Sequence, residues 1–217
     1  MTNPADKGIS GTPGELTSDN IGIILLAAGS SSRMGKSKQL LLLHDEPLLL
    51  RSVKSALGLG LDKMVVVLGF NEQEHRKVIK DLAVNILVNA GWQRGMGNSI
   101  KAGLHYLLEI APETIAVILM TCDQPELNTD HLRELIRKFR QTNNRIVASH
   151  YGNTYGIPAL FERSLFPRIL GLDDEKGAKK IIRQNADSMV GVNFPGGEID
   201  LDTMKEYQEY LKRQSSK

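Results

Sequence analysis

The chain has 217 residues, and at roughly 150 residues per domain this length predicts one compact domain. Hydrophobic residues make up 41% and charged residues 24% of the chain, an ordinary globular balance that excludes a disordered protein. The net charge of +2 gives no global attraction to nucleic acid or to a membrane surface, so neither is an expected partner. The single cysteine, Cys122, excludes an intramolecular disulfide and any site built from several thiolates.

The first twenty residues differ in composition from the rest of the chain. They are rich in Gly, Pro, Ser, Thr and Asn and show no apolar periodicity, so we expect a disordered leader at residues 1–20 and the folded domain at residues 21–217. They lack the basic start and apolar core of a secretory signal. No stretch of the sequence approaches the ~18 consecutive apolar residues that a bilayer-spanning helix needs. We therefore expect a soluble, cytoplasmic protein.

Short apolar runs alternate with helical patterns from Ile21 onward. Continuous apolar runs predict strands at residues 21–27, 64–68, 84–88, 115–120 and 145–149. Apolar residues at helical spacing predict helices at 47–57 with Pro47 in the first turn, at 98–110, at 129–139 with Thr129 as N-cap, and through 207–211. This alternation predicts an α/β fold: a single-domain, three-layer αβα sandwich around a mostly parallel sheet.

In such sheets, ligands bind beyond the carboxyl ends of the strands. The residues that follow Ala27, Leu68, Val88 and Met120 are therefore expected to share one cleft. The pattern of elements predicts this place for a site before any motif is considered.

The loop after the first predicted strand combines small and basic residues. It runs Leu26-Ala-Ala-Gly-Ser-Ser-Ser-Arg-Met-Gly-Lys-Ser-Lys38. Small residues let the backbone approach a phosphate, and successive free N–H groups bind anions. Arg33, Lys36 and Lys38 add positive charge within the same short stretch. A phosphate-binding loop explains this composition better than an ordinary Gly/Ser turn with solvated bases.

Gly35-Lys36-Ser37 also resembles the end of a P-loop. That motif needs a glycine at the position of Ser30, whereas Gly29 lies one residue too early. A P-loop kinase or NTPase stays open as an alternative. A dinucleotide-binding dehydrogenase is not expected, because no Gly-x-Gly-x-x-Gly follows the first strand.

An aspartate follows the predicted strand at 115–120, within Thr121-Cys-Asp-Gln-Pro125. A carboxylate at the end of a buried parallel strand points into the predicted cleft, and Mg²⁺ prefers one or two carboxylates together with phosphate oxygens. Asp123 is therefore a candidate metal ligand. A turn or helix-capping aspartate is the alternative.

These segments resemble the nucleotidyltransferases that share the glycosyltransferase-A-like, nucleotide-diphospho-sugar transferase fold. The pattern of that family appears here as Leu26-Ala27-Ala28-Gly29, then Arg33-Met34-Gly35, then Lys38. The resemblance implies that the loop wraps a nucleoside triphosphate and that Arg33 and Lys38 are catalytic, stabilising charge on the phosphates. The residues implied in nucleotide binding are Leu26, Ala27, Ala28, Gly29, Ser30, Arg33, Lys38, Gly95, Ser99 and Asp123.

Other segments resemble the molybdenum cofactor cytidylyltransferases within this family. Cys122-Asp123-Gln124-Pro125 resembles their metal-binding Cys-Asp-x-Pro, and residues 198–203 are similar to a segment whose aspartate completes the magnesium site. Asp123 and Asp200 are thus the implied Mg²⁺ ligands, and Asp202 is either a further ligand or only a helix N-cap. Residues 92–99 resemble a segment whose serine faces the base, so Ser99 is implied in a base or ribose contact and Gly95 in giving it room.

The implied reaction is Mg²⁺-dependent transfer of CMP from CTP to the terminal phosphate of the molybdopterin cofactor, with release of pyrophosphate. Residues 156–161 and 174–178 resemble the acceptor side, and a molybdoenzyme or its chaperone is a possible partner. Ala28 favours CTP over GTP by resemblance only. Two alternatives stay open: a relative that uses GTP or a sugar or alditol phosphate, and a non-catalytic nucleotide-binding protein of molybdoenzyme maturation.

Overall fold

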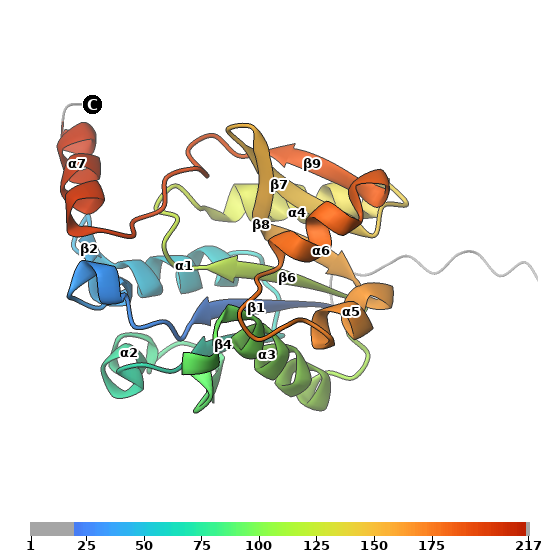
Figure 1. Ribbon diagram of the computed structural model, residues 1–217, viewed down its shortest axis with the longest axis horizontal. Helices are drawn as coiled ribbons and strands as arrows, with labels where there is room; N and C mark the ends of the chain where they lie inside the picture. The colour runs from blue at the N-terminus through green and yellow to red at the C-terminus, as the bar shows by residue number, and fades with distance from the viewer. Residues whose placement is uncertain (1–19, 216–217) are drawn as a thin grey trace, which may run out of the picture.

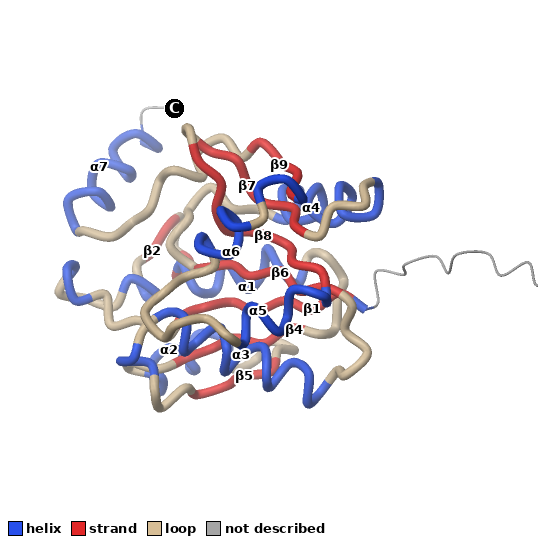
Figure 2. Tube along the Cα trace, turned by 45° about the vertical axis from the view of Figure 1, so that its right-hand side comes forward, coloured by secondary structure: helices blue, strands red, loops and turns tan. Residues whose placement is uncertain are grey.

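The computed structural model describes residues 20–215, so the predicted leader lies outside the described residues except for Asn20. A seven-stranded sheet has the order β5-β4-β1-β6-β8-β7-β9 and extends from β5 to β9 across the molecule (Figures 1 and 2). Its strands are β1 (Ile21–Ala27), β4 (Met64–Leu68), β5 (Asn85–Val88), β6 (Ala116–Thr121), β7 (Ile146–Tyr151), β8 (Thr154–Glu162) and β9 (Met189–Asn193). The helices are α1 (Leu48–Leu57), α2 (Glu72–Ile79), α3 (Met96–Ile110), α4 (Thr129–Gln141), α5 (Phe166–Leu170), α6 (Lys179–Gln184) and α7 (Met204–Ser215).

The sheet is mostly parallel, as the sequence predicts. β1 pairs in parallel with β4 and β6, and β4 with β5, whereas β8 runs antiparallel between β6 and β7. All five predicted strands form, each within one or two residues of its expected ends. β8 and β9 were not predicted. β8 contains Gly156 and Pro158, two residue types that are depleted in strands.

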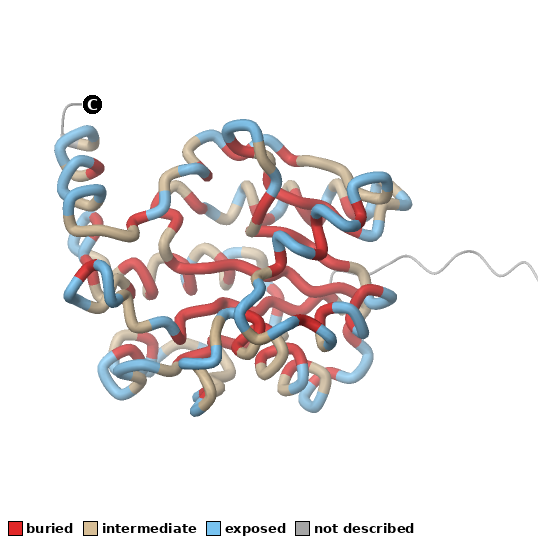
Figure 3. The backbone as a smooth tube through the Cα atoms, viewed as in Figure 1, coloured by how far each residue is buried: buried red, intermediate tan, exposed pale blue. Residues whose placement is uncertain are grey.

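Both faces of the central strand are buried, which makes the fold three-layered. Ile23 and Leu25 pack with α1 and α4 on one face, and Ile24 and Leu26 pack with α3, α5 and α6 on the other (Figure 1). Figure 3 shows the central strands as a continuous buried layer. The continuous apolar run of β1 thus reflects burial on both sides.

Two predicted helix starts shift by one residue. Pro47 is the N-cap of α1 rather than a residue of its first turn. The predicted N-cap of α4, Thr129, is wrong: Asn128 is the cap, and its side chain accepts from the His131 N–H at 3.0 Å. Thr129 instead donates its hydroxyl to the carbonyl of Ser55. Within residues 20–215, no helix has the length and apolar character needed to cross a membrane.

The loop at residues 26–38, called the phosphate-type loop below, does not lead into an α-helix. Residues 32–34 and 38–40 form short 3₁₀ turns, and the small hairpin of β2 (Leu42–Leu43) and β3 (Glu46–Pro47) follows. A P-loop requires a helix directly after its Gly-Lys-Ser. The P-loop alternative is therefore wrong for this chain.

Candidate active site

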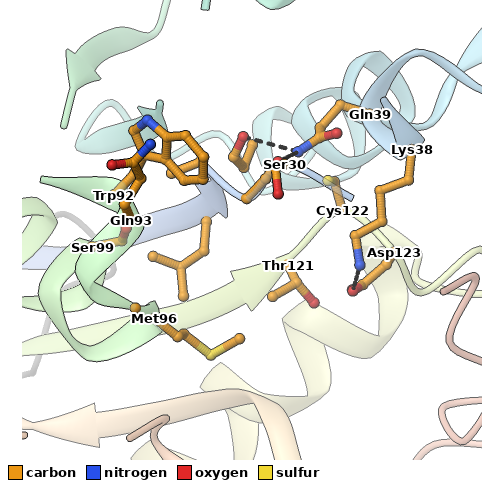
Figure 4. Close-up of a pocket in the computed structure, with 15 residues that line it drawn as sticks. Ser30, Lys38, Gln39, Trp92, Gln93, Met96, Ser99, Thr121, Cys122 and Asp123 are labelled. Atoms are coloured by element: carbon orange, nitrogen blue, oxygen red, sulfur yellow. Dashed lines mark hydrogen bonds and ion pairs between the residues drawn. The ribbon is translucent and has the colours of Figure 1, made fainter. Parts of the chain in front are cut away.

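A cavity of about 270 Å³ opens at the carboxyl ends of β1 and β6 (Figure 4). Most of the nucleotide-binding residues expected from the sequence line it: Leu26, Ala27, Ala28, Gly29, Ser30, Lys38, Gly95, Ser99 and Asp123. Trp92, Met96, Thr121 and Cys122 complete much of the wall. Segments after β1, β5 and β6 thus share one cleft, as predicted.

The segment after β4 supports the cavity without lining it. The Phe70 N–H donates to the carbonyl of Ala28 at 3.0 Å, and the Phe70 ring packs edge-on against Trp92 at 5.7 Å. The prediction that the residues after Leu68 would share the cleft is therefore wrong, since they contact residues of its wall from outside.

Charged groups from three distant parts of the chain meet at the edge of this cavity. Lys38 Nζ donates to Asp123 Oδ2 at 2.6 Å and to Asp202 Oδ1 at 3.0 Å. Arg33 Nη2 donates to Asp202 Oδ2 at 2.7 Å. The Lys38 and Asp123 side chains are only 18% and 16% exposed, so their charges interact with little screening by water.

Burial and ion pairing act against each other on Lys38. Burial by itself lowers the pKa of the ammonium, but the interactions with Asp123, and then with Cys122 and Asp202, together outweigh it, so the pKa of Lys38 lies above its ordinary value. Lys38 is therefore positively charged throughout the neutral range.

Asp200 completes a group of three carboxylates. Burial first, and then the charges of Asp123 and Asp202, raises the pKa of Asp200 to about 6. Lys38 donates to both Asp123 and Asp202. Among the residues that the structure describes, no group of three Asp, Glu, His or Cys side chains has the arrangement of a metal site. The three carboxylates face three cations, because Lys179 lies near Asp200 while Lys38 and Arg33 pair with Asp123 and Asp202, and carboxylate oxygens are hard ligands. The donor set therefore fits a hard divalent cation.

Packing around Leu201 explains how the C-terminal segment reaches the site. The Leu201 N–H donates to the carbonyl of Asp123 at 3.1 Å. Its side chain is fully buried in a small cluster with Met34, Leu43 and Tyr210. The residues on either side of Leu201 are thereby held beside the phosphate-type loop and the end of β6.

Asp202 does not act as the N-cap of α7. The Thr203 hydroxyl accepts from the Glu206 N–H at 3.2 Å, and Glu206 Oε2 accepts from the Thr203 N–H at 2.8 Å. These reciprocal bonds are a capping box with Thr203 as the cap. The carboxylate of Asp202 faces Arg33 and Lys38 instead.

Gln39 is a site residue that sequence reasoning missed. It is 1% exposed, and its Nε2 donates to the carbonyls of Ala27 at 3.1 Å and Gly29 at 2.9 Å. Its Oε1 accepts from the hydroxyls of Ser31 and Ser37. The signal was a polar residue between the basic loop and the Leu-Leu-Leu-Leu run, and a single such residue is not distinctive.

Ser99 and Gly95, the two residues predicted to lie beside the base, both line the first cavity, and Gly95 also packs against the chain before α6. Ser99 is buried, and its hydroxyl accepts from Asn89 Nδ2 at 3.0 Å. Gly95 has a φ of +122°, and a Cβ there would lie 2.5 Å from the carbonyl oxygen of Asp174. The absence of a side chain makes room for the chain before α6, and room for a base stays a prediction.

A second cavity of about 250 Å³ adjoins the first. Met96, Thr121 and Asp123 line both cavities. The remaining wall of the second cavity includes Gln124, Tyr151, Ile157, Gly177, Ala178, Lys179 and Asp200. Burial, with the charge of Asp200 next, raises the pKa of Tyr151 to about 12, so its phenol stays protonated at neutral pH. The site is therefore two cavities that meet at Asp123.

Known proteins share both this sequence pattern and this fold. The MobA-like NTP transferase domain matches residues 23–189. Purine catabolism protein PucB of Bacillus subtilis is 27% identical over 85% of this chain and 92% of its own length. The crystal structure of Rv0371c from Mycobacterium tuberculosis has a TM-score of 0.79 at 26% identity, covering 91% of this chain and all of that one. A manganese complex of Rv0371c has a TM-score of 0.75 at 24% identity, covering 89% of this chain and 98% of that one. The domain match spans most of the chain and includes the phosphate-type loop and Asp123, so the chain belongs to the MobA-like NTP transferase domain family and is a nucleotidyltransferase.

Proposed function

We propose that the protein transfers CMP from CTP to the terminal phosphate of the molybdopterin cofactor and releases pyrophosphate, with Mg²⁺ as the metal. The observation that carries the proposal is the position of Lys38, which lines the first cavity and donates to Asp123, the aspartate that lines both cavities. A nucleotide in the first cavity and an acceptor in the second would face each other across Asp123. The choice of CTP and of this acceptor is supported by the likeness of residues 122–125 to the cytidylyltransferase pattern.

Asp123 and Asp200 are the residues that would hold Mg²⁺, with Asp202 as a further ligand. Their carboxylate oxygens are hard donors of the kind that Mg²⁺ prefers, and all three lie beside the cations Lys38, Arg33 or Lys179. When bound, the ion would supply positive charge at the phosphates. The manganese complex of Rv0371c supports a divalent ion in this family.

The main chemical difficulty of the proposed reaction is to bring two anions together. The acceptor phosphate is already ionised at neutral pH, so the site needs no strong general base. The backbone of residues 26–31 binds the triphosphate, and Lys38 and Arg33 offset the charge that grows on the leaving pyrophosphate. Catalysis thus comes from positioning and preorganised positive charge.

The second cavity suits a phosphorylated acceptor. Lys179 lines it with its ammonium about 6.0 Å from the centre of the Tyr151 ring. Tyr151, Met96 and Ile157 add apolar surface for the body of the acceptor. We expect the protein to work in the cytoplasm and a molybdoenzyme or its chaperone to receive the product.

Pyrophosphate release tests the proposal directly. The protein is incubated with Mg²⁺, each of the four NTPs in turn, and either molybdopterin cofactor or a set of sugar and alditol phosphates. Release that requires CTP and the cofactor supports the proposal. Release with GTP or a sugar phosphate would replace it with another transferase specificity. Tight nucleotide binding without pyrophosphate from any acceptor would instead indicate a non-catalytic accessory protein.

Lys38→Ala tests the role of the ammonium. We expect turnover to fall about 10²–10³-fold, because a preorganised charge at the phosphates is lost, while the fold is retained. Lys36→Ala is the matched control, since it removes the same charge from an exposed position of the same loop and should lose far less. A Lys38→Ala protein with wild-type thermal stability and undiminished turnover would refute the role.

A further inference from the structure

We propose that Asp174 is a positioning residue that couples nucleotide binding to the acceptor side of the site. It ties the base turn (residues 92–99) to the acceptor loop (residues 173–178), so that a nucleotide on the turn also orders the loop. The inference rests on the proposed function, because it takes the base to bind at the turn and the acceptor at the loop.

The Asp174 carboxylate contacts the base turn and α3 through several groups. Its Oδ2 lies 2.6 Å from Arg94 Nη2, and its Oδ1 lies 2.6 Å from Lys101 Nζ. Asn98 Nδ2 donates to Oδ1 at 3.4 Å, and the Asn98 N–H donates to the Asp174 carbonyl at 3.2 Å. The Asp174 and Lys101 side chains are 21% and 23% exposed, so this pair is partly shielded from solvent. One side chain of the acceptor loop thus bonds the turn before α3 and the first turns of the helix.

The two segments also approach at backbone distance. A Cβ on Gly97 would lie 2.1 Å from the carbonyl oxygen of Asp173, and a Cβ on Gly177 would lie 3.0 Å from Met96 Sδ. In Figure 1 the connection from α5 to α6 crosses directly in front of the start of α3. Such close packing leaves little freedom for one segment to move without the other.

A chain of contacts runs from this junction into each cavity. On the base side, Asn89 Nδ2 donates both to Asn98 Oδ1 and to the Ser99 hydroxyl, each at 3.0 Å. On the acceptor side, the loop continues into Gly177, which lines the second cavity, and Met96 lines both cavities. A nucleotide that orders the turn would therefore order the acceptor loop, and by linkage an acceptor would strengthen nucleotide binding by the same factor.

Hydrogen–deuterium exchange of the full chain tests the coupling. The probe is CTP with a methylene group between its α- and β-phosphates, added with Mg²⁺ so that no transfer occurs. We expect slower exchange at residues 27–38, where the phosphates bind, and also at residues 173–180. Protection of 27–38 without any change at 173–180 would overturn the coupling and leave the proposed function intact. No protection at either segment would overturn the proposed function itself, and the coupling with it.

Asp174→Asn then identifies the residue responsible. Asp173→Asn is the matched control, because Asp173 lies in the same loop and loses the same charge, but its carboxylate pairs only with exposed Lys180 among the described ion pairs. In Asp174→Asn, we expect nucleotide protection of 173–180 to disappear while that of 27–38 remains. KM for both substrates should rise about tenfold with kcat changed less than about threefold. Equal effects of the two substitutions, or a fall in kcat alone, would overturn the assignment.

Discussion

Gln39 directly follows the phosphate-type loop, and its side chain bonds back to four residues of the loop. Replacing it with leucine removes these four hydrogen bonds at nearly constant volume. Two of these bonds hold the carbonyls of Ala27 and Gly29, and the other two hold the hydroxyls of Ser31 and Ser37. The loop that carries Lys38 is therefore expected to lose its internal brace.

The magnitude follows from the partners that Gln39 leaves behind. The hydroxyl of Ser37 keeps its contact with His75 Nε2 at 2.5 Å, and that of Ser31 keeps the Lys38 N–H at 3.1 Å, so these two groups remain partnered. The Ala27 carbonyl loses its side-chain donor in a buried setting, at about 1–3 kcal/mol, whereas Gly29 is exposed and its carbonyl can bond water instead. We expect the free energy of unfolding to fall by about 1–3 kcal/mol.

Urea unfolding and nucleotide titration measure the two consequences of Gln39→Leu. For a domain of this size the melting temperature should fall by about 3–9 °C. Affinity for the nucleotide should fall at least about tenfold, because Lys38 and the loop N–H groups lose their alignment. Gln73→Leu, the same change at an exposed position of α2, should alter stability by less than about 0.5 kcal/mol. A Gln39→Leu protein as stable as the wild type, with unchanged affinity, would show that the brace is unimportant.

Two further substitutions probe packing and pH dependence. Gly97→Ala should lower the free energy of unfolding, measured in urea, by more than about 2 kcal/mol, because the new Cβ would lie 2.1 Å from the backbone carbonyl oxygen of Asp173. This loss is expected even though alanine favours helices over glycine. Equal or higher stability would contradict the contact. Burial, opposed in part by Glu134, lowers the pKa of His131 from 6.5 to about 4. Between these two pH values the unfolded chain binds more protons than the folded one, so stability falls as the pH drops from 6.5 to about 4. Since the ring is only partly buried, we expect His131→Asn to reduce the loss of stability between pH 7 and pH 5 by about 1–2 kcal/mol, and identical losses in both proteins would refute this assignment.

Local signals explain why much of the fold was predictable. A continuous apolar run such as 21–27 reports burial on both faces, and the spacing of Leu132, Leu135 and Ile136 reports one buried helix face. β8 escaped prediction because Gly156 and Pro158 weaken its strand pattern, and only its place between β6 and β7 makes it a strand. The N-cap of α4 was misassigned because Asn128 and Thr129 are both good caps, and only the backbone conformation distinguishes them.

By itself, the sequence determined the α/β class, because apolar runs and helical spacing are local patterns, and it predicted a phosphate-binding loop and roles for Lys38 and Asp123 from residues that are close together in the chain. Only the tertiary structure decided which groups meet. Lys38 bonds carboxylates that lie 85 and 164 positions away, and Asp202 turns toward Lys38 because Thr203 caps α7 and Leu201 is anchored in a buried cluster. Gln39 and Asp174 likewise acquire their roles through contacts with distant or buried groups. Ion pairs and buried hydrogen bonds depend on distances in space, and those distances exist only after the sheet has brought the strand ends together.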